Sequence, residues 1–428
     1  MAADQPFKPS PLMSLDEALG QVLSQVKPLT DTEFVSSLEA DGRFLAENLM
    51  SALQVPPQDN SSMDGYAVRI EDLPNPGVQL EVTQRIPAGH HGRELKPGEA
   101  ARIFTGAPIP PGANAVVMQE DAQAVDAVGF AAGNPVVLIK VVPKLGQWIR
   151  RSGEDVRKGD VVLPQGTRLS PASLGMAASI GRAQLNVLRK PRVALFSTGD
   201  ELVMPGDIAP EKMPPGAIYN SNRFFLRALL IRAGCDVTDL GIVPDNLPDT
   251  IKVLQAASHN HDLVLTSGGV SVGEEDHVKP AVEQLGRLSL WQISMKPGKP
   301  FAFGQLNAQA GPQGASTYFM GLPGNPVSSY VTFQLLVRPF LLALQGQGHV
   351  QSQPYLLQAD FDLPKADKRR EFLRVKRNAN GSLDLFPNQS SGVLTSVVWG
   401  EGVIDNPSLQ VIQRGDWVRF FPFSDWLQ

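Results

Sequence analysis

The strongest constraint on the fold is an alternation of strand-like and helix-like segments between residues 191 and 340. Apolar runs such as RVALFST, DVTDLGIV and DLVLTS alternate with amphipathic stretches such as SNRFFLRALLIRAG and LPDTIKVLQAASH. This alternation predicts a mostly parallel sheet that helices cover on both faces. Ligands of such sheets bind outside the carboxyl ends of the strands. The sequence therefore predicts an α/β domain and indicates which edge of its sheet holds a site.

The segments on either side of this domain differ from it in pattern. Short runs rich in β-branched residues, broken by Gly, Pro and Asn, predict an antiparallel β domain that ends near residue 140. Similar runs predict a small β domain at the C-terminal end. We expect helices after the capping residues Ser14, Ser170 and Asn325, and a further helix over 31–48.

Composition excludes some classes of protein. At 428 residues the chain is long enough for roughly three domains of about 150 residues each. A net charge of −5 argues against a nucleic-acid-binding protein, which usually carries a basic excess. The single cysteine, Cys235, excludes an internal disulfide and a Cys-rich zinc site and fits a reducing cytoplasm. We expect no membrane span, because no apolar run reaches about 18 residues.

Acidic residues follow three of the predicted strands. Glu201, Asp245 and Asp276 each lie in a loop after such a strand, and parallel strands bring these loops to one edge of the sheet. Gly268 and Gly269 would let backbone N–H groups approach an anion. Carboxylates without His or Cys suit Mg²⁺, which one or two acids usually hold together with phosphates. The alternative for each loop is an ordinary solvated turn.

Two further loops favour anion binding. In MKPGKPFAFG, Lys296 and Lys299 lie on a loop stiffened by prolines, which suits a small dianion. In GLPGNPVSS, Pro323 and Pro326 precede or open a helix whose N–H groups could face an anion. A basic surface turn and a plain helix start are the respective alternatives.

The β domain and the segment after it also carry polar loops. Asp59 lies in QDNSSMDGYAV, Thr105 in RIFTGAPIPPGANAVV and Asp155 in RRSGEDVRKGD. An Asx turn explains some of the first loop, and solvated ion pairs are the alternative for the last.

These segments together resemble the MoeA family of molybdopterin molybdenumtransferases, which includes the C-terminal part of gephyrin-type proteins. The motifs that carry the resemblance run in the family's order over essentially the whole chain, as DNSSMDGYAV, RIFTGAPIPPGANAVVMQE, RRSGEDVRKGD, LFSTGDEL, YNSN, TSGGVSVGEEDH, KPGKPFAFG and GLPGNPVSS.

The resemblance implies a multi-domain α/β protein with four domains. They are a mixed domain from residues 1–55 and 141–188, an inserted β domain over 56–140, a three-layer molybdopterin-binding α/β domain over 189–340, and a C-terminal β-barrel over 341–428. It also implies a cytoplasmic homodimer that needs Mg²⁺.

The implied reaction inserts molybdenum from molybdate into adenylylated molybdopterin and releases AMP. Further implied partners are a molybdopterin adenylyltransferase and chaperones of molybdoenzymes, with no nucleic acid and no membrane. The α/β domain alone also resembles molybdopterin adenylyltransferases and CinA-like nucleotide hydrolases, and a non-catalytic scaffold like gephyrin is a third alternative.

The resemblance also implies roles for single residues. Glu201, Asp245 and Asp276 would hold Mg²⁺ and the pterin nucleotide. Asp59, Thr105 and Asp155 would be further catalytic residues, with Asp59 and Thr105 supplied by the partner subunit. The residues implied to bind substrate are Ser267, Gly268, Gly269, Ser271, Gly273, Lys296, Lys299, Pro323, Pro326, Arg374 and Ser391.

Two departures from the family pattern bear on these roles. Some relatives carry a second lysine four residues before Lys296, where this chain has Gln292. The C-terminal match is looser, so Arg370 is an alternative to Arg374 and Ser390 an alternative to Ser391.

Overall fold

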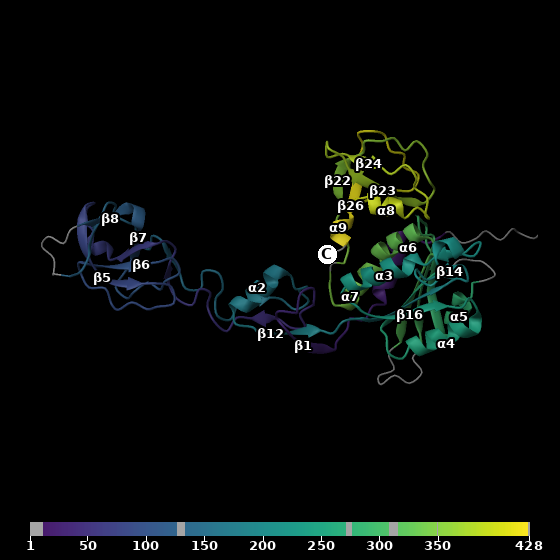
Figure 1. Cartoon of the computed structure of the whole chain (residues 1–428), viewed down its shortest axis with the longest axis horizontal. Coiled ribbons are helices and arrows are strands. Elements are labelled where there is room, and N and C mark those ends of the chain that lie inside the picture. Colours follow the sequence, from purple (N-terminus) through teal and green to yellow (C-terminus); the bar gives the residue numbers. More distant parts are fainter. Residues whose placement is uncertain (1–11, 126–132, 271–275, 308–315, 349, 427–428) are drawn as a thin grey trace, which may run out of the picture. The chain divides into compact units, whose positions relative to one another are not determined.

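Figure 1 shows the computed structural model of the chain, which describes residues 12–125, 133–270, 276–307, 316–348 and 350–426. The chain divides into two compact units. Unit 1 comprises the chain up to Glu33, Gly42–Phe44 and everything from Val187 onward, and unit 2 comprises Phe34–Asp41 and Leu45–Asn186. The boundaries between the units fall within β1 (Thr32–Ser36), within β12 (Gln184–Leu188) and on either side of Gly42–Phe44.

A six-stranded sheet forms the centre of unit 1, in the order β16-β13-β17-β21-β20-β18. The first four strands are parallel, and β20 and β18 pair antiparallel at one side. The mostly parallel sheet is thus confirmed. The strands are β13 (Arg192–Thr198), β16 (Asp236–Val243), β17 (Leu263–Ser267), β18 (Gly286–Gln292), β20 (Pro300–Leu306) and β21 (Thr317–Leu322).

Helices cover both faces of this sheet (Figure 1). Alternate residues of β13 divide between the two apolar cores: Val193 and Leu195 pack with one set of helices, and Ala194 and Phe196 with the other. The first set is α1 (Leu15–Ser24), α3 (Ser221–Arg232), α6 (Pro326–Thr332) and α7 (Arg338–Leu344); the second is α4 (Leu247–Ala257) and α5 (Val278–Leu285).

Helices α6 and α7 are joined by a π-helical turn over Phe333–Val337. The continuous stretch Pro326–Leu344 is long and apolar enough to cross a membrane by length and composition, yet 78% of it is buried inside the protein. It is therefore a core helix of unit 1, and its apolar character is explained by the sheet and helices that it packs against.

The C-terminal part of unit 1 is a second six-stranded sheet. Its strands follow the order β19-β23-β25-β26-β22, and β24 pairs with β23. Its first strand comes from the lysine-rich loop of the α/β domain. The elements are β19 (Met295–Lys296), β22 (Tyr355–Gln358), β23 (Arg370–Arg377), β24 (Leu383–Leu385), α8 (Thr395–Trp399), β25 (Gly402–Asn406), β26 (Trp417–Pro422) and α9 (Phe423–Trp426).

Unit 2 is built on a six-stranded sheet in the order β7-β4-β6-β5-β9-β8, with short strand pairs and one helix outside it. The sheet strands are β4 (Gly65–Val68), β5 (Val78–Ile86), β6 (Glu99–Ile103), β7 (Ala115–Met118), β8 (Ala122–Val125) and β9 (Val136–Ile139); the others are β2 (Leu49–Met50), β3 (Asn60–Ser61), β10 (Ile149–Arg150), β11 (Val161–Leu163) and α2 (Pro171–Ser179).

Two sequence-based expectations about local structure are wrong. No helix forms over 31–48; the segment begins with β1, whose β-branched and aromatic residues Thr32, Phe34 and Val35 favour a strand. The β domain is not wholly antiparallel, because β5 and β6 pair in parallel across a connection long enough for a crossover. The helix predicted after Asn325 does form, with Pro326 as its first residue, although the Asn325 side chain makes no capping hydrogen bond.

Other helix starts follow the sequence. Ser14 forms a capping box with Glu17 at the start of α1. Ser170 accepts a hydrogen bond from the Ser173 N–H, and Pro171 is the first residue of α2.

Candidate active site

Three strand ends meet at the carboxyl edge of the central sheet. The Thr198 hydroxyl, at the end of β13, donates to Asp245 Oδ1 over 3.0 Å. Gly268, after β17, has a φ of +97°, and a Cβ there would clash with the carbonyl oxygen of Thr198. A Cβ on Gly269 would lie 2.7 Å from the Thr198 methyl carbon. The loops after β13, β16 and β17 are thus in contact, and only glycine permits so close an approach.

A buried asparagine fastens the end of β17. Asn222, in the first turn of α3, donates from Nδ2 to the Ser267 hydroxyl and to the Gly324 carbonyl, each over 2.7 Å. The N–H of Gly268 donates to the Leu322 carbonyl over 3.1 Å. That N–H is therefore used within the fold, and the observed role of Gly268 is close packing. Pro323, beside this carbonyl, is buried.

The acids at this edge supply oxygen ligands. A Cβ on Gly199 would lie 2.6 Å from Glu201 Oε2, so the Glu201 side chain folds back over the end of β13. Asp276 is half-buried just before α5. Among the described residues, no group of three His, Cys, Asp or Glu is close enough to hold a metal ion unaided. Ser271 and Gly273 lie outside the described residues.

The lysine loop is held by the C-terminal sheet. β19 pairs in parallel with β23, with Lys296 opposite Glu371. The Lys296 ammonium donates to Glu371 Oε1 over 2.9 Å and to Asp367 Oδ2 over 3.1 Å. Burial opposes this charge, but the two carboxylates raise the pKa of Lys296 above its ordinary value. Lys299 is exposed on the same loop.

The alternative arginines occupy different environments. Arg374 is 1% exposed and donates to the Phe372 carbonyl and the Ser396 hydroxyl. Burial lowers its pKa to about 10. Arg370 is more accessible and pairs with Asp405 and Asp16.

The start of α6 is occupied by the chain itself. The Val327 N–H, next to Pro326, donates to the carbonyl of Ser391 over 3.0 Å. The sequence predicted that N–H groups at this helix start could bind an anion. One of them instead donates to the loop of the C-terminal domain that contains Ser391.

The remaining predicted residues, Asp59, Thr105 and Asp155, lie in neighbouring loops of unit 2. Asp59 accepts from the Ser152 N–H and pairs with Arg151, which together outweigh partial burial and lower the pKa of Asp59. Thr105 donates from its N–H (2.8 Å) and hydroxyl (2.9 Å) to Asp64, and these bonds lower the pKa of Asp64. Asp155 is exposed on the loop after β10.

Sequence reasoning missed Thr198, Asn222 and Glu371, which hold the loops of unit 1, and Asp64, which holds a loop of unit 2. The segment YNSN did hold a signal for Asn222. Asn220 caps α3, and a helix start needs only one capping residue, so the second asparagine is free for another role. The other three act through residues far along the chain, which no local pattern reveals.

The sequence matches three described families, which together span most of the chain. Residues 13–181 match the MoeA N-terminal region (domain I and II). Residues 194–343 match a probable molybdopterin binding domain. Residues 357–423 match the MoeA C-terminal region (domain IV).

Individual relatives agree with these matches. The chain is similar to a molybdopterin molybdenumtransferase of Haemophilus influenzae, with 43% identity over 97% of this chain and 100% of that one. A Nostoc protein of the same name is 37% identical over 86% of this chain and 83% of its own. A solved structure of the molybdopterin biosynthesis MoeA protein from Pyrococcus horikoshii aligns with a TM-score of 0.79 at 28% identity, covering 96% of this chain and all of that one.

Proposed function

Because the chain belongs to the MoeA family of molybdopterin molybdenumtransferases, we propose that it takes molybdopterin in adenylylated form together with molybdate and releases AMP. The chain is a transferase of molybdenum cofactor biosynthesis and inserts molybdenum into molybdopterin. Matches over the full length of curated relatives favour this activity over a single-domain adenylyltransferase or nucleotide hydrolase.

The observation that supports the location of the site is the contact between three strand ends through Thr198. This residue hydrogen-bonds Asp245 and packs against Gly268. An acid from one loop and a glycine turn from another are thereby held at the sheet edge where α/β proteins bind ligands.

The residues at this edge fit Mg²⁺. Their donors are the carboxylate oxygens of Glu201 and Asp245, with Asp276 before α5, and Mg²⁺ in proteins is usually held by one or two carboxylates plus substrate phosphates. When bound, the ion would offset the charge of the two anionic substrates and polarise a phosphoryl oxygen. Thr198 orients Asp245 through its hydroxyl, so the carboxylate is fixed before any ligand arrives.

We assign molybdate to the neighbourhood of the lysine loop. Lys299 is exposed there and carries a charge that attracts a dianion, while Lys296 lies beside the carboxylates of the C-terminal sheet. Arg370 and Ser390 remain alternatives to Arg374 and Ser391. Arg374 is enclosed by its own domain, so Arg370 is the better placed of the two arginines to reach a ligand.

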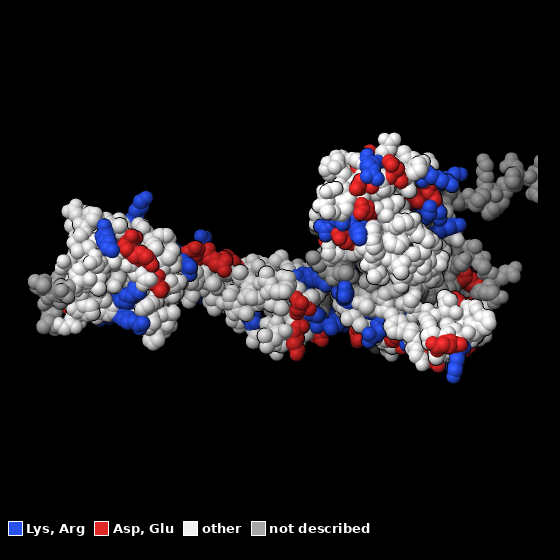
Figure 2. All heavy atoms as spheres, turned by 45° about the horizontal axis from the view of Figure 1, so that its top comes forward, with Lys and Arg blue, Asp and Glu red and all other residues white. Residues whose placement is uncertain are grey.

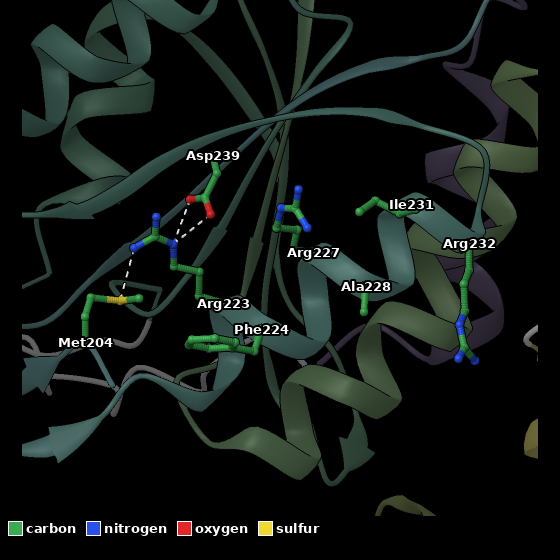
Figure 3. A pocket seen from close by; sticks show the side chains of 8 residues that line it. All are labelled: Met204, Arg223, Phe224, Arg227, Ala228, Ile231, Arg232 and Asp239. Atoms are coloured by element: carbon green, nitrogen blue, oxygen red, sulfur yellow. Dashed lines mark hydrogen bonds and ion pairs between the residues drawn. The ribbon is translucent and has the colours of Figure 1, made fainter. Parts of the chain in front are cut away.

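Asp59 and Thr105 would complete the site from a second subunit, and Asp155 would be a further catalytic residue. The outer surface of α3 supports a homodimer (Figure 3). Phe224 and Ile231, seven residues apart on one side of α3, are 54% and 47% exposed and border a hollow of about 420 Å³. Exposed apolar side chains at this spacing form a stripe suited to burial, and a second copy of the chain would cover it.

The enzyme would act in the cytoplasm. The single thiol, Cys235, is buried and unpaired with another cysteine, and the apolar helix Pro326–Leu344 lies in the core.

The reaction is tested by incubating the protein with adenylylated molybdopterin, Mg²⁺ and molybdate and measuring AMP. We expect AMP release that needs both molybdate and Mg²⁺. Turnover of molybdopterin without the adenylyl group, at the same rate and with no AMP, would contradict the proposed substrate.

Dimerisation is tested by sedimentation of the Phe224→Glu, Ile231→Glu double variant. We expect a monomer with little activity, while Val398→Glu, which places the same charge on an 82% exposed valine of the C-terminal domain, remains a dimer. A wild-type monomer at assay concentration would contradict the dimer.

A further inference from the structure

Glu371 is a buried carboxylate beside the cations assigned to molybdate. It is 4% exposed, and its Oε1 accepts a hydrogen bond from the Lys296 ammonium over 2.9 Å. Its charge also acts on Arg374, whose pKa it tends to raise against the effect of burial. One acid thus faces both the lysine and the arginine that the sequence suggested for an anionic substrate.

The second carboxylate oxygen of Glu371 takes no part in the ion pair with Lys296. Oε2 is buried and has no hydrogen-bond partner among the described residues. A buried charged oxygen without a partner is costly. The ion pair with Lys296 therefore satisfies one oxygen of Glu371 and leaves the other without a hydrogen bond beside cations that could hold a ligand.

A second acid shares the same ammonium. Asp367 accepts from Lys296 over 3.1 Å and also binds Arg369, whose side chain holds the pKa of Asp367 well below its ordinary value. Acidic and basic side chains lie side by side over the C-terminal domain in the view of Figure 2. Two carboxylates on one ammonium leave Lys296 with no surplus positive charge to offer a dianion.

We propose that Glu371 competes with molybdate for Lys296 and thereby sets how tightly the enzyme binds that anion. This inference rests on the proposed function, in which the lysine loop receives molybdate. Molybdate carries two negative charges, and a carboxylate within a few ångströms repels it while occupying the donor that it needs. Binding of molybdate then requires the Lys296 ammonium to exchange a carboxylate for the incoming oxyanion.

The test is Glu371→Gln, which preserves an oxygen acceptor for Lys296 and removes the charge. Binding of molybdate alone is measured by calorimetry, and binding of adenylylated molybdopterin is measured in parallel. We expect molybdate to bind about tenfold more tightly, since removal of one nearby like charge changes an anion's affinity by roughly that factor. Pterin-nucleotide affinity should be unchanged.

Glu401→Gln is the matched control. Glu401 belongs to the same domain and pairs with Arg377, at the end of the β23–β25 ladder opposite to Glu371. It removes an equal charge, and molybdate affinity should remain that of the wild type. Glu371→Gln should tighten molybdate binding less in the Lys296→Ala background than in the wild type, because without the lysine only the charge repulsion is relieved and there is no competition to remove.

Two outcomes would overturn the inference, and they differ in meaning. Unchanged or weaker molybdate binding in Glu371→Gln, with weaker binding in Lys296→Ala, would mean that Glu371 does not compete. Unchanged molybdate binding in Lys296→Ala would remove the lysine from the molybdate site and contradict the proposed function as well.

Urea unfolding checks that each variant folds. If Glu371→Gln does not fold, Asp367→Asn removes the more exposed acid from the same ammonium and tests whether a carboxylate on Lys296 competes with molybdate.

Discussion

The hydroxyl of Thr198 donates a hydrogen bond to Asp245, and this bond joins the ends of the neighbouring parallel strands β13 and β16. The Asp245 carboxylate is therefore oriented by a residue at the end of β13. The backbone N–H of Asp245 also donates to the Asp200 carboxylate over 3.3 Å, so the loops after β13 and β16 both constrain Asp245.

Asp245→Asn should keep the fold and lose activity. The amide oxygen can still accept from Thr198, but the charge proposed to hold Mg²⁺ is gone, so AMP release should fall at least about tenfold. Asp236→Asn is the control, because Asp236 is exposed at the opposite end of the same strand. Titration of AMP release against Mg²⁺ is the measurement, and wild-type turnover of a folded Asp245→Asn protein would refute the role.

Gly268→Ala should destabilise the protein more than Gly206→Ala. Both glycines have positive φ, +97° and +100°, so both variants incur about 1–2 kcal/mol of backbone strain. Only at Gly268 does the new methyl group meet the Thr198 carbonyl, which should add about 1–3 kcal/mol of overpacking and weaken pterin-nucleotide binding. Urea unfolding and ligand binding are compared for the two variants; equal losses would contradict the close approach of β13 and β17.

Asp262→Asn should lower the free energy of unfolding of unit 1 far more than Asp31→Asn. Both acids bind Arg189, but Asp262 receives two hydrogen bonds from its guanidinium and one from the Arg192 N–H, and its side chain is 13% exposed. Removing one charge of such a pair costs about 3–5 kcal/mol. The Asp31 side chain is 64% exposed, and its loss should cost under about 1 kcal/mol. Urea midpoints test the ranking.

Unit 2 should lose stability in acid partly through Asp64. Its two hydrogen bonds from Thr105 hold the folded-state pKa below the ordinary value of 3.8. The stabilisation is thus complete above pH 3.8 and is lost as the pH falls through the lower, folded-state pKa. Asp64→Asn should therefore show a shallower fall in urea midpoint between about pH 4 and pH 2 than the wild type does. Parallel profiles would contradict this role.

The sequence predicted the elements whose signals are local. The helix caps at Ser14 and Ser170 and the parallel strands of unit 1 follow from patterns within a few residues. The meeting of acidic loops at one sheet edge followed from topology alone. The strand at Thr32–Ser36 was missed because a short apolar segment can favour either structure until its partner is known.

The environments of individual site residues could not be predicted in this way. Lys296 reads as a free cation in KPGKP, yet its ammonium meets Glu371 and Asp367, which lie some seventy residues later in the chain. Arg374 is implied by the resemblance to bind substrate, yet it is enclosed by its own domain. In both cases tertiary structure supplies the surroundings of the side chain, from residues that no local pattern identifies.

The strand β19 has a consequence for the exchange of domains between related proteins. Met295 and Lys296 belong to the α/β domain but pair with Arg370 and Glu371 at the edge of the C-terminal sheet. A chimaera that replaced residues 357–423 with those of a relative would pair an imported sheet with a resident edge strand. The C-terminal domain therefore cannot be exchanged as its contiguous segment alone. Two residues of the lysine loop complete its sheet and would have to be exchanged with it.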